Sequence, residues 1–63
     1  MPIATINILE GRTDEQKEAL IEQVTEAICN SLGSPVQAVR IIINEMPNTQ
    51  FGVGGKTAKS LGR

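Results

Sequence analysis

The residues with the clearest potential for chemistry are Pro2 and two arginines, Arg12 and Arg40. An initiator methionine is usually removed before a small second residue, and removal of Met1 would leave Pro2 with a free secondary amine. The chain contains no histidine, so the side chain that normally titrates near neutral pH is absent. An α-amino group is the remaining ordinary candidate for that pH range. We therefore take as a hypothesis that Pro2 is a general base.

An amine and two guanidinium groups are suited to proton transfer next to a carbonyl group. Removal of a proton next to a carbonyl group needs a base whose pKa is near the working pH. If such an amine lay in an apolar pocket beside two guanidinium groups, both desolvation and like charge would disfavour its protonated form, and the pKa of Pro2 would fall toward neutrality. Arginine stays protonated, binds carboxylates bidentately and can stabilise negative charge on a carbonyl oxygen. Such chemistry requires no metal or organic cofactor, and the sequence offers a site for neither.

Each residue also has an ordinary structural explanation. A proline at position 2 often reflects only methionine processing, and Arg12 taken alone would be a solvated turn residue. Arg40 is harder to explain in this way, because an arginine at the head of an apolar strand must find an anion or an interface. Phe51, the only aromatic residue, would ordinarily pack in a core or a subunit contact.

Length and composition limit the possible partners. The 63 residues, which we take as one domain over 1–63, can hide only roughly 60% of their unfolded surface. Cys29 is the only cysteine and no zinc ligand set exists, so association is the remaining source of stability. A net charge of −1 and a single aromatic residue argue against nucleic acid. The absence of a signal segment or long apolar run predicts a cytoplasmic protein without membrane contact.

A strand and a helix are expected to position the first two candidate residues. Residues 3–9 are rich in β-branched and aliphatic side chains, with Pro2 at their start and a turn at Gly11. Residues 13–16 fit a capping box at the start of an amphipathic helix of about 19 residues. Gly33 would cap its C-terminus, and Pro35 would prevent it from continuing.

The second half of the chain predicts another strand and a glycine-rich segment. Ser34 would cap a short turn or 3₁₀ segment with Pro35 in its first position. Residues 39–46 form the second strand, parallel to the first through a right-handed crossover, and the run 41–43 of three isoleucines predicts burial on both faces. The single helix covers one face of the two-stranded sheet, so we expect further copies of the chain to cover the other face. Residues 51–55 predict a small hairpin or docking loop, and 56–63 a polar tail of weak pattern with one helical turn.

Several segments together resemble the 4-oxalocrotonate tautomerase family. They occur in the order and at the spacing typical of that family, and they cover essentially the whole chain. Each motif is weak alone, but their coincidence in so short a chain is specific. The segments are Pro2-Ile3-Ala4, Ile8-Leu9-Glu10-Gly11-Arg12, Asp14-Glu15-Gln16-Lys17, Val39-Arg40 and Phe51-Gly52-Val53-Gly54-Gly55.

The resemblance implies an α/β fold, a single β-α-β unit with parallel strands and a short C-terminal hairpin, assembled as a homohexamer that is a trimer of dimers. It implies that Pro2 is the general base in keto–enol isomerisation of unsaturated 2-keto dicarboxylic acids, a step of aromatic hydrocarbon catabolism. Arg40 would bind one carboxylate and the 2-keto oxygen, and Arg12 the distal carboxylate. Phe51 would form an apolar wall. The arginines would reach the Pro2 of neighbouring subunits.

Other enzymes of the same superfamily need residues that can be looked for in this chain. The 3-chloroacrylic acid dehalogenases of the same superfamily add a water-activating acid in the Phe51 region and an arginine near Leu9. This chain has Val53 and no acid between Gln50 and Arg63, so hydration of a haloacrylate is disfavoured as the main activity. Two alternatives stay open: a related tautomerase acting on another 2-keto or enol acid, and a non-catalytic oligomeric interaction protein on the same scaffold.

Overall fold

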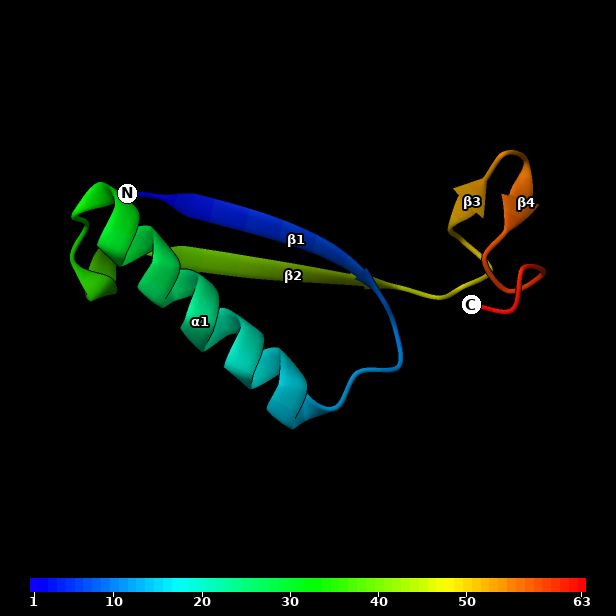
Figure 1. Cartoon of the computed structure of the whole chain (residues 1–63), viewed down its shortest axis with the longest axis horizontal. Helices are drawn as coiled ribbons and strands as arrows, with labels where there is room; N and C mark the ends of the chain where they lie inside the picture. The colour runs from blue at the N-terminus through cyan, green and yellow to red at the C-terminus, as the bar shows by residue number, and fades with distance from the viewer.

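The computed structural model describes residues 1–63. Two parallel strands lie side by side with one helix across one face, and a small antiparallel hairpin projects beyond the end of the second strand (Figure 1). This arrangement confirms the predicted β-α-β unit with a short C-terminal hairpin. In chain order the elements are β1 (Ile3–Leu9), α1 (Asp14–Leu32), the 3₁₀ helix η1 (Val36–Ala38), β2 (Arg40–Met46), β3 (Gly52–Val53) and β4 (Lys56–Thr57).

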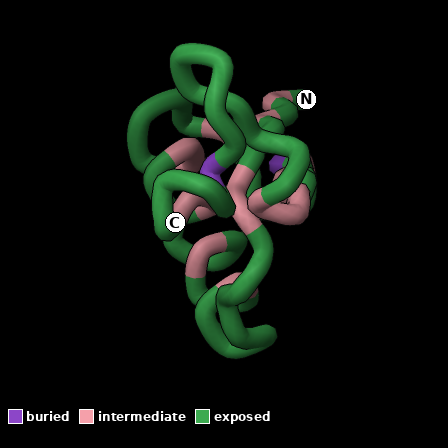
Figure 2. The backbone as a smooth tube through the Cα atoms, turned by 90° about the vertical axis from the view of Figure 1, so that its right-hand side faces the viewer, coloured by how far each residue is buried: buried purple, intermediate pink, exposed green.

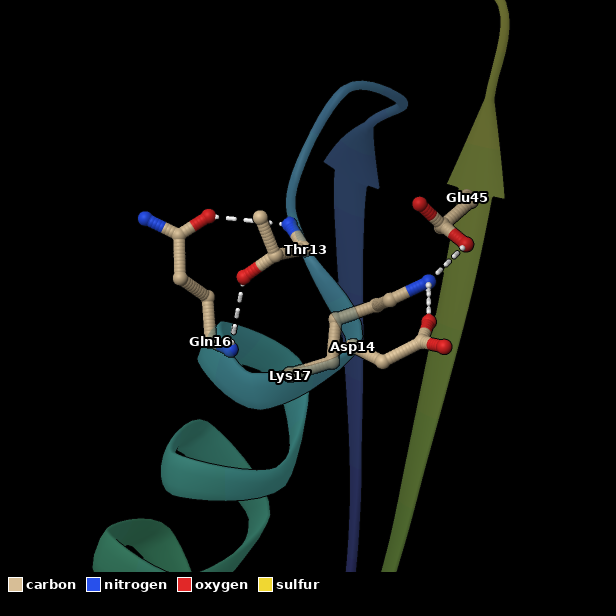
Figure 3. Close-up of polar contacts among 5 residues, drawn as sticks. All are labelled: Thr13, Asp14, Gln16, Lys17 and Glu45. Atoms are coloured by element: carbon tan, nitrogen blue, oxygen red, sulfur yellow. Dashed lines mark hydrogen bonds and ion pairs between the residues drawn. The ribbon is translucent and has the colours of Figure 1, made fainter.

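The ends of α1 are fixed by the predicted caps. The Gln16 backbone N–H donates to Thr13 Oγ1 at 3.1 Å, and the Thr13 backbone N–H donates to Gln16 Oε1 at 2.9 Å (Figure 3). These bonds satisfy two donors that the first turn of a helix leaves free. At the other end Gly33 adopts a left-handed φ of 70°, and its N–H donates to the Cys29 carbonyl at 2.9 Å. The predicted helix of about 19 residues is confirmed.

The register of the sheet separates its two faces. Paired residues of parallel strands point to the same side, so Ile6 and Ile43 share the face under α1 and are half-buried. Thr5 and Ile42 share the opposite face, where Ile42 is 47% exposed and neighbouring Ile3 is 61% exposed. Burial of the isoleucine run on both faces is therefore not found within one chain, because the single helix covers one face only.

A single chain encloses almost no core. Only Val39 and Ala58 are buried, at 9% and 0% exposure, and the rest of the backbone is intermediate or exposed (Figure 2). The accessible surface is 4709 Å², whereas a compact monomer of this mass exposes about 4,000 Å². The radius of gyration is 14.6 Å, against about 11 Å for a compact domain of this length. The projecting hairpin and the open sheet face account for this extended shape.

Two predictions about the segment between α1 and β2 are wrong. Pro35 is not the first residue of the 3₁₀ helix but its N-cap, with extended backbone angles, and no side chain caps the helix. Ser34 therefore lacks the predicted capping role. The turn is closed by backbone bonds instead, since the Ala38 N–H donates to the Pro35 carbonyl at 3.0 Å. The second strand begins at Arg40, one residue later than predicted.

The C-terminal segment is more ordered than the predicted polar tail. Lys56 and Thr57 pair with β3 through a two-residue turn at Gly54 and Gly55, which have φ values of 61° and 86°. Positive φ at both central positions suits the twist of a hairpin and favours glycine. Ala58 follows β4 and is fully buried, and its N–H donates to the Phe51 carbonyl at 2.7 Å. The segment therefore folds back onto the hairpin.

Lys17 links the first turn of α1 to β2. Its Nζ lies 2.9 Å from Glu45 Oε1 and 3.5 Å from Asp14 Oδ1 (Figure 3). The hydrogen bond to Glu45, with the charges of Glu45 and Asp14, raises the pKa of Lys17 above its ordinary value of 10.5, although desolvation opposes the rise. A raised lysine pKa contributes stability that is present below the unfolded-state pKa and is lost as pH rises through the folded-state pKa.

We expect Glu45→Gln to lower the melting temperature at neutral pH, because the substitution removes the charge that holds Lys17. The difference from the wild type should shrink as pH rises above 10.5, where Lys17 loses its proton. Thermal unfolding followed by circular dichroism between pH 7 and 11 measures this difference. Glu18→Gln removes an exposed helix carboxylate that forms no ion pair, so it is the matched control. An equal effect of both substitutions would contradict the role of the link.

Candidate active site

Pro2 and Arg40 lie at the same end of the sheet. Ile3 and Arg40 are register partners, and the Arg40 backbone N–H donates to the Pro2 carbonyl at 3.0 Å. This bond extends the ladder between β1 and β2 by one residue and holds the N-terminal segment beside the start of β2. Pro2 is half-buried there, whereas Arg40 is exposed.

The Arg40 side chain is held by backbone carbonyl groups. Its Nη1 donates to the Gln37 carbonyl and, at 3.2 Å, to the Val39 carbonyl, both around the end of η1. No carboxylate of the chain lies within ion-pair distance of this guanidinium. Arginine has five N–H donors in a planar fork, so the donors on Nε and Nη2 stay available. Arg40 can therefore bind an external carboxylate or an oxyanion.

Arg12 lies at the opposite end of β1. The Glu10 N–H donates to the Met46 carbonyl at 2.9 Å, after which Gly11 turns the chain with a φ of 119°. Thr13 then caps α1, so Arg12 stands between two fixed points. Its exposed guanidinium has no hydrogen bond or ion pair within the chain and lines two surface hollows. An unpaired cation between fixed backbone positions is suited to hold an anionic group.

Phe51 lies beside the hairpin, far from the N-terminus (Figure 1). It directly precedes β3 and is 39% exposed. The bond from the Ala58 N–H to its carbonyl fixes its backbone against the folded C-terminal segment. A partly exposed aromatic ring in that position can cover an apolar part of a ligand or contact another chain.

The structure does not bring the four predicted site residues together within one chain. Pro2 and Arg40 lie at the start of the paired strands, Arg12 lies in the turn after β1, and Phe51 directly precedes β3 of the projecting hairpin (Figure 1). The seven residues of β1 that separate Pro2 from the turn before Arg12 span about 20 Å. One small substrate cannot contact residues so far apart. A site built from all four residues requires more than one chain.

One residue near this region was not predicted from the sequence. Arg63 lines the same hollow as Arg12, together with Asn48, and is tied to Asn48 through its backbone. No local pattern indicated this, because the contact joins the loop after β2 to the far end of the chain. The only available signals were the charge of Arg63 and the hydrogen-bonding capacity of Asn48.

No three side chains among histidine, cysteine, aspartate and glutamate lie close enough together to bind a metal ion. α1 is the only long helix, and it is too polar to cross a membrane.

Comparison with known proteins places the chain in a family. A family model described as "Tautomerase enzyme" matches residues 2–60. The chain belongs to the tautomerase family. It is 62% identical over 63 residues to the 2-hydroxymuconate tautomerase of Stutzerimonas stutzeri, and the match covers the whole of both chains. The resemblance deduced from the sequence motifs is thereby confirmed.

Solved structures agree with this assignment. A structure from work on the 4-oxalocrotonate tautomerase isozymes of Methylibium petroleiphilum superposes with a TM-score of 0.94 at 48% identity, covering 98% of this chain and all of that one. A heterohexameric 4-oxalocrotonate tautomerase from Chloroflexus aurantiacus gives a TM-score of 0.92 at 38% identity, and the match covers 97% of this chain and 98% of that one.

Membership at this level of identity makes the chain an enzyme with keto–enol tautomerase activity. This finding removes the alternative of a non-catalytic interaction protein on the same scaffold. The roles of Pro2, Arg12, Arg40 and Phe51 stay predictions.

Proposed function

We propose that this tautomerase isomerises 2-hydroxymuconate, the enol form of 4-oxalocrotonate, with Pro2 as the general base. The observation that carries the proposal is the 62% identity, over the full length of both chains, to the 2-hydroxymuconate tautomerase of Stutzerimonas stutzeri. A cytoplasmic location and a role in aromatic hydrocarbon catabolism belong to the same proposal and rest on the class of substrate.

The proposed reaction moves one proton and needs no external reactant. From 2-hydroxymuconate, the neutral Pro2 amine removes the proton of the 2-hydroxyl group, which leaves a dienolate with its negative charge on that oxygen. The protonated amine then returns the proton to the carbon at the far end of the conjugated system. The electron pair on the oxygen forms the ketone, one carbon–carbon double bond shifts to the position next to it, and the electron pair of the other double bond forms the new C–H bond.

Arg40 and Arg12 would divide the binding of the substrate between them. The free donors of Arg40 suit the 2-keto oxygen and its neighbouring carboxylate, where negative charge grows as the dienolate forms. Arg12, which has no partner within the chain, suits the distal carboxylate. Phe51 would cover the apolar middle of the substrate and exclude water from the Pro2 amine, which favours its neutral form.

This division of roles supports assembly as a homohexamer, a trimer of dimers. Pro2 and Arg12 of one chain lie too far apart to serve one substrate, so each site would combine residues of neighbouring chains. The open sheet face, with Ile3 at 61% and Ile42 at 47% exposure, offers apolar surface for such contacts. A relative with 38% identity is described as a heterohexamer, which supports the proposed number of chains.

Ile42→Asp should weaken the assembly, because a carboxylate on the open face would be buried without a partner. We expect dissociation to begin at a protein concentration at least about tenfold higher than for the wild type, since burial of an unpaired charge costs several kcal/mol. Analytical ultracentrifugation measures the mass of the assembly at each protein concentration. Ile42→Val keeps a β-branched apolar side chain and is the matched control. A hexamer of unchanged stability in Ile42→Asp would exclude this face as an interface.

The substrate is tested by comparing rates on three acids with processed protein that lacks Met1. We expect kcat/KM to be highest for ketonisation of 2-hydroxymuconate, lower for the enol of phenylpyruvate, and lowest for hydration of 3-chloroacrylate followed by chloride release. A higher kcat/KM for the monocarboxylic enol would favour the alternative, a related tautomerase with another natural substrate. Chloride release as the main activity would contradict the proposal.

A further inference from the structure

A second arginine, Arg63, lines the surface hollow beside Arg12. The hollow has a volume of about 560 Å³ and joins the turn after β1, the loop after β2 and the last residue of the chain. Three of its lining residues have charged side chains, namely the cations Arg12 and Arg63 and the anion Glu10, and Arg63 also carries the α-carboxylate of the chain. The three others are Leu9, Gly11 and Asn48.

Arg63 is held in place and is not a frayed end. Its backbone N–H donates to the Ala58 carbonyl at 2.9 Å, and its carbonyl accepts from Asn48 Nδ2 at 3.0 Å. Ala58 is fully buried, and the Lys59 N–H donates to the Asn48 carbonyl at 3.0 Å. Both anchors of Arg63 are therefore fixed to the packed hairpin, and Asn48 bonds the segment from both its backbone and its side chain.

The two guanidinium groups lack anionic partners. No carboxylate of the chain lies within 4.0 Å of either group, and neither group makes a side-chain hydrogen bond. Glu10 lines the same hollow without forming an ion pair. Glu10 and the α-carboxylate of Arg63 equal the two cations in number, but neither guanidinium group is paired with them, so both keep the planar donors that make bidentate contact with a carboxylate.

We propose that Arg63 binds the distal carboxylate of the substrate together with Arg12, and that the pair selects dicarboxylic over monocarboxylic acids. The inference rests on the proposed function, because it assigns the hollow to the end of the substrate far from the reacting ketone. Arg63 is a binding residue in this assignment. Asn48 is a positioning residue that acts through the backbone of Arg63.

The test compares two substrates that differ by one carboxylate. For 2-hydroxymuconate, Arg63→Ala should raise KM about threefold to fivefold with little change in kcat, as expected for one exposed charge pair. For 2-hydroxypenta-2,4-dienoate, which lacks the distal carboxylate, KM should stay the same. Arg63→Lys should recover part of the loss, and Asn48→Ala should reproduce part of it. Lys59→Ala removes an equal charge outside the hollow and should match the wild type for both substrates.

Arg12→Ala separates failure of this inference from failure of the proposed function. A rise in the KM for 2-hydroxymuconate in Arg12→Ala but not in Arg63→Ala would overturn the role of Arg63 and leave the proposed function standing. An equal rise for both substrates in Arg63→Ala would also overturn it, because the effect would not depend on the distal carboxylate. An unchanged KM for 2-hydroxymuconate in Arg12→Ala would instead count against the proposed function.

Discussion

Pro2→Ala should lower kcat/KM for 2-hydroxymuconate by about 10²-fold, within the range that a positioned general base contributes. The proline ring fixes the direction of its nitrogen, whereas the terminal amine of alanine rotates freely and is more fully hydrated. Wild-type protein that retains Met1 should lose about 10²-fold to 10⁴-fold, because an amide nitrogen cannot accept the proton. Stopped-flow or steady-state absorbance assays measure both effects.

The fold should survive these changes. The bond from the Arg40 N–H to the residue-2 carbonyl uses backbone atoms only, so alanine at position 2 keeps it. The number of chains in the assembly and the circular dichroism spectrum of Pro2→Ala should match those of the wild type. Pro35→Ala, at the N-cap of η1, is the matched control and should keep full activity. Full activity in Pro2→Ala, or in protein that retains Met1, would exclude Pro2 as the base.

Arg40→Ala should have the second largest effect, a fall in kcat of about 10²-fold to 10³-fold, as seen when a donor to a developing oxyanion is lost. Negative charge appears on the 2-keto oxygen only as the proton leaves, so Arg40 would stabilise the transition state more than the bound substrate. Steady-state kinetics on 2-hydroxymuconate separates kcat from KM.

Arg40→Lys is the matched variant for this residue. Lysine keeps the charge but not the planar fork, so we expect kcat between those of Arg40→Ala and the wild type. The melting temperature should change little, because the side chain of Arg40 makes only two hydrogen bonds, one to the exposed Gln37 carbonyl and one to the part-buried Val39 carbonyl. A rise in KM alone, with kcat unchanged, would assign Arg40 to ground-state binding and contradict its role at the oxygen.

The sequence predicted those parts of the fold that local patterns specify. The capping box of Thr13 and Gln16, Gly33 at the helix end, and the β-branched residues of β1 all act over a few residues, and the structure confirms each element. The fold-back at Ala58 was missed, because strands of two residues and one buried methyl group leave no periodic pattern. The prediction of a Ser34 cap failed because backbone bonds alone close η1.

The candidate site residues stay predictions, and their arrangement does not follow from local patterns in the sequence. The spacing of Pro2, Arg12, Arg40 and Phe51 led to the family, which the comparisons confirm. Their positions at two ends of β1 follow from the sheet register, and a shared site would depend on contacts between chains that no local pattern encodes. The place of Arg63 was also hidden, because Asn48 holds it across 15 residues of sequence.

The most direct test of the central claim is an NMR titration of the Pro2 nitrogen in ¹⁵N-labelled, methionine-free protein, set beside the pH dependence of kcat/KM. We predict a single titration with a pKa below the ordinary α-amino range of about 7.7–8.0, equal to the pKa of the group that limits kcat/KM on its acidic side. A Pro2 nitrogen that titrates at or above that range, or with a pKa different from the kinetic one, would contradict the assignment of Pro2 as the base.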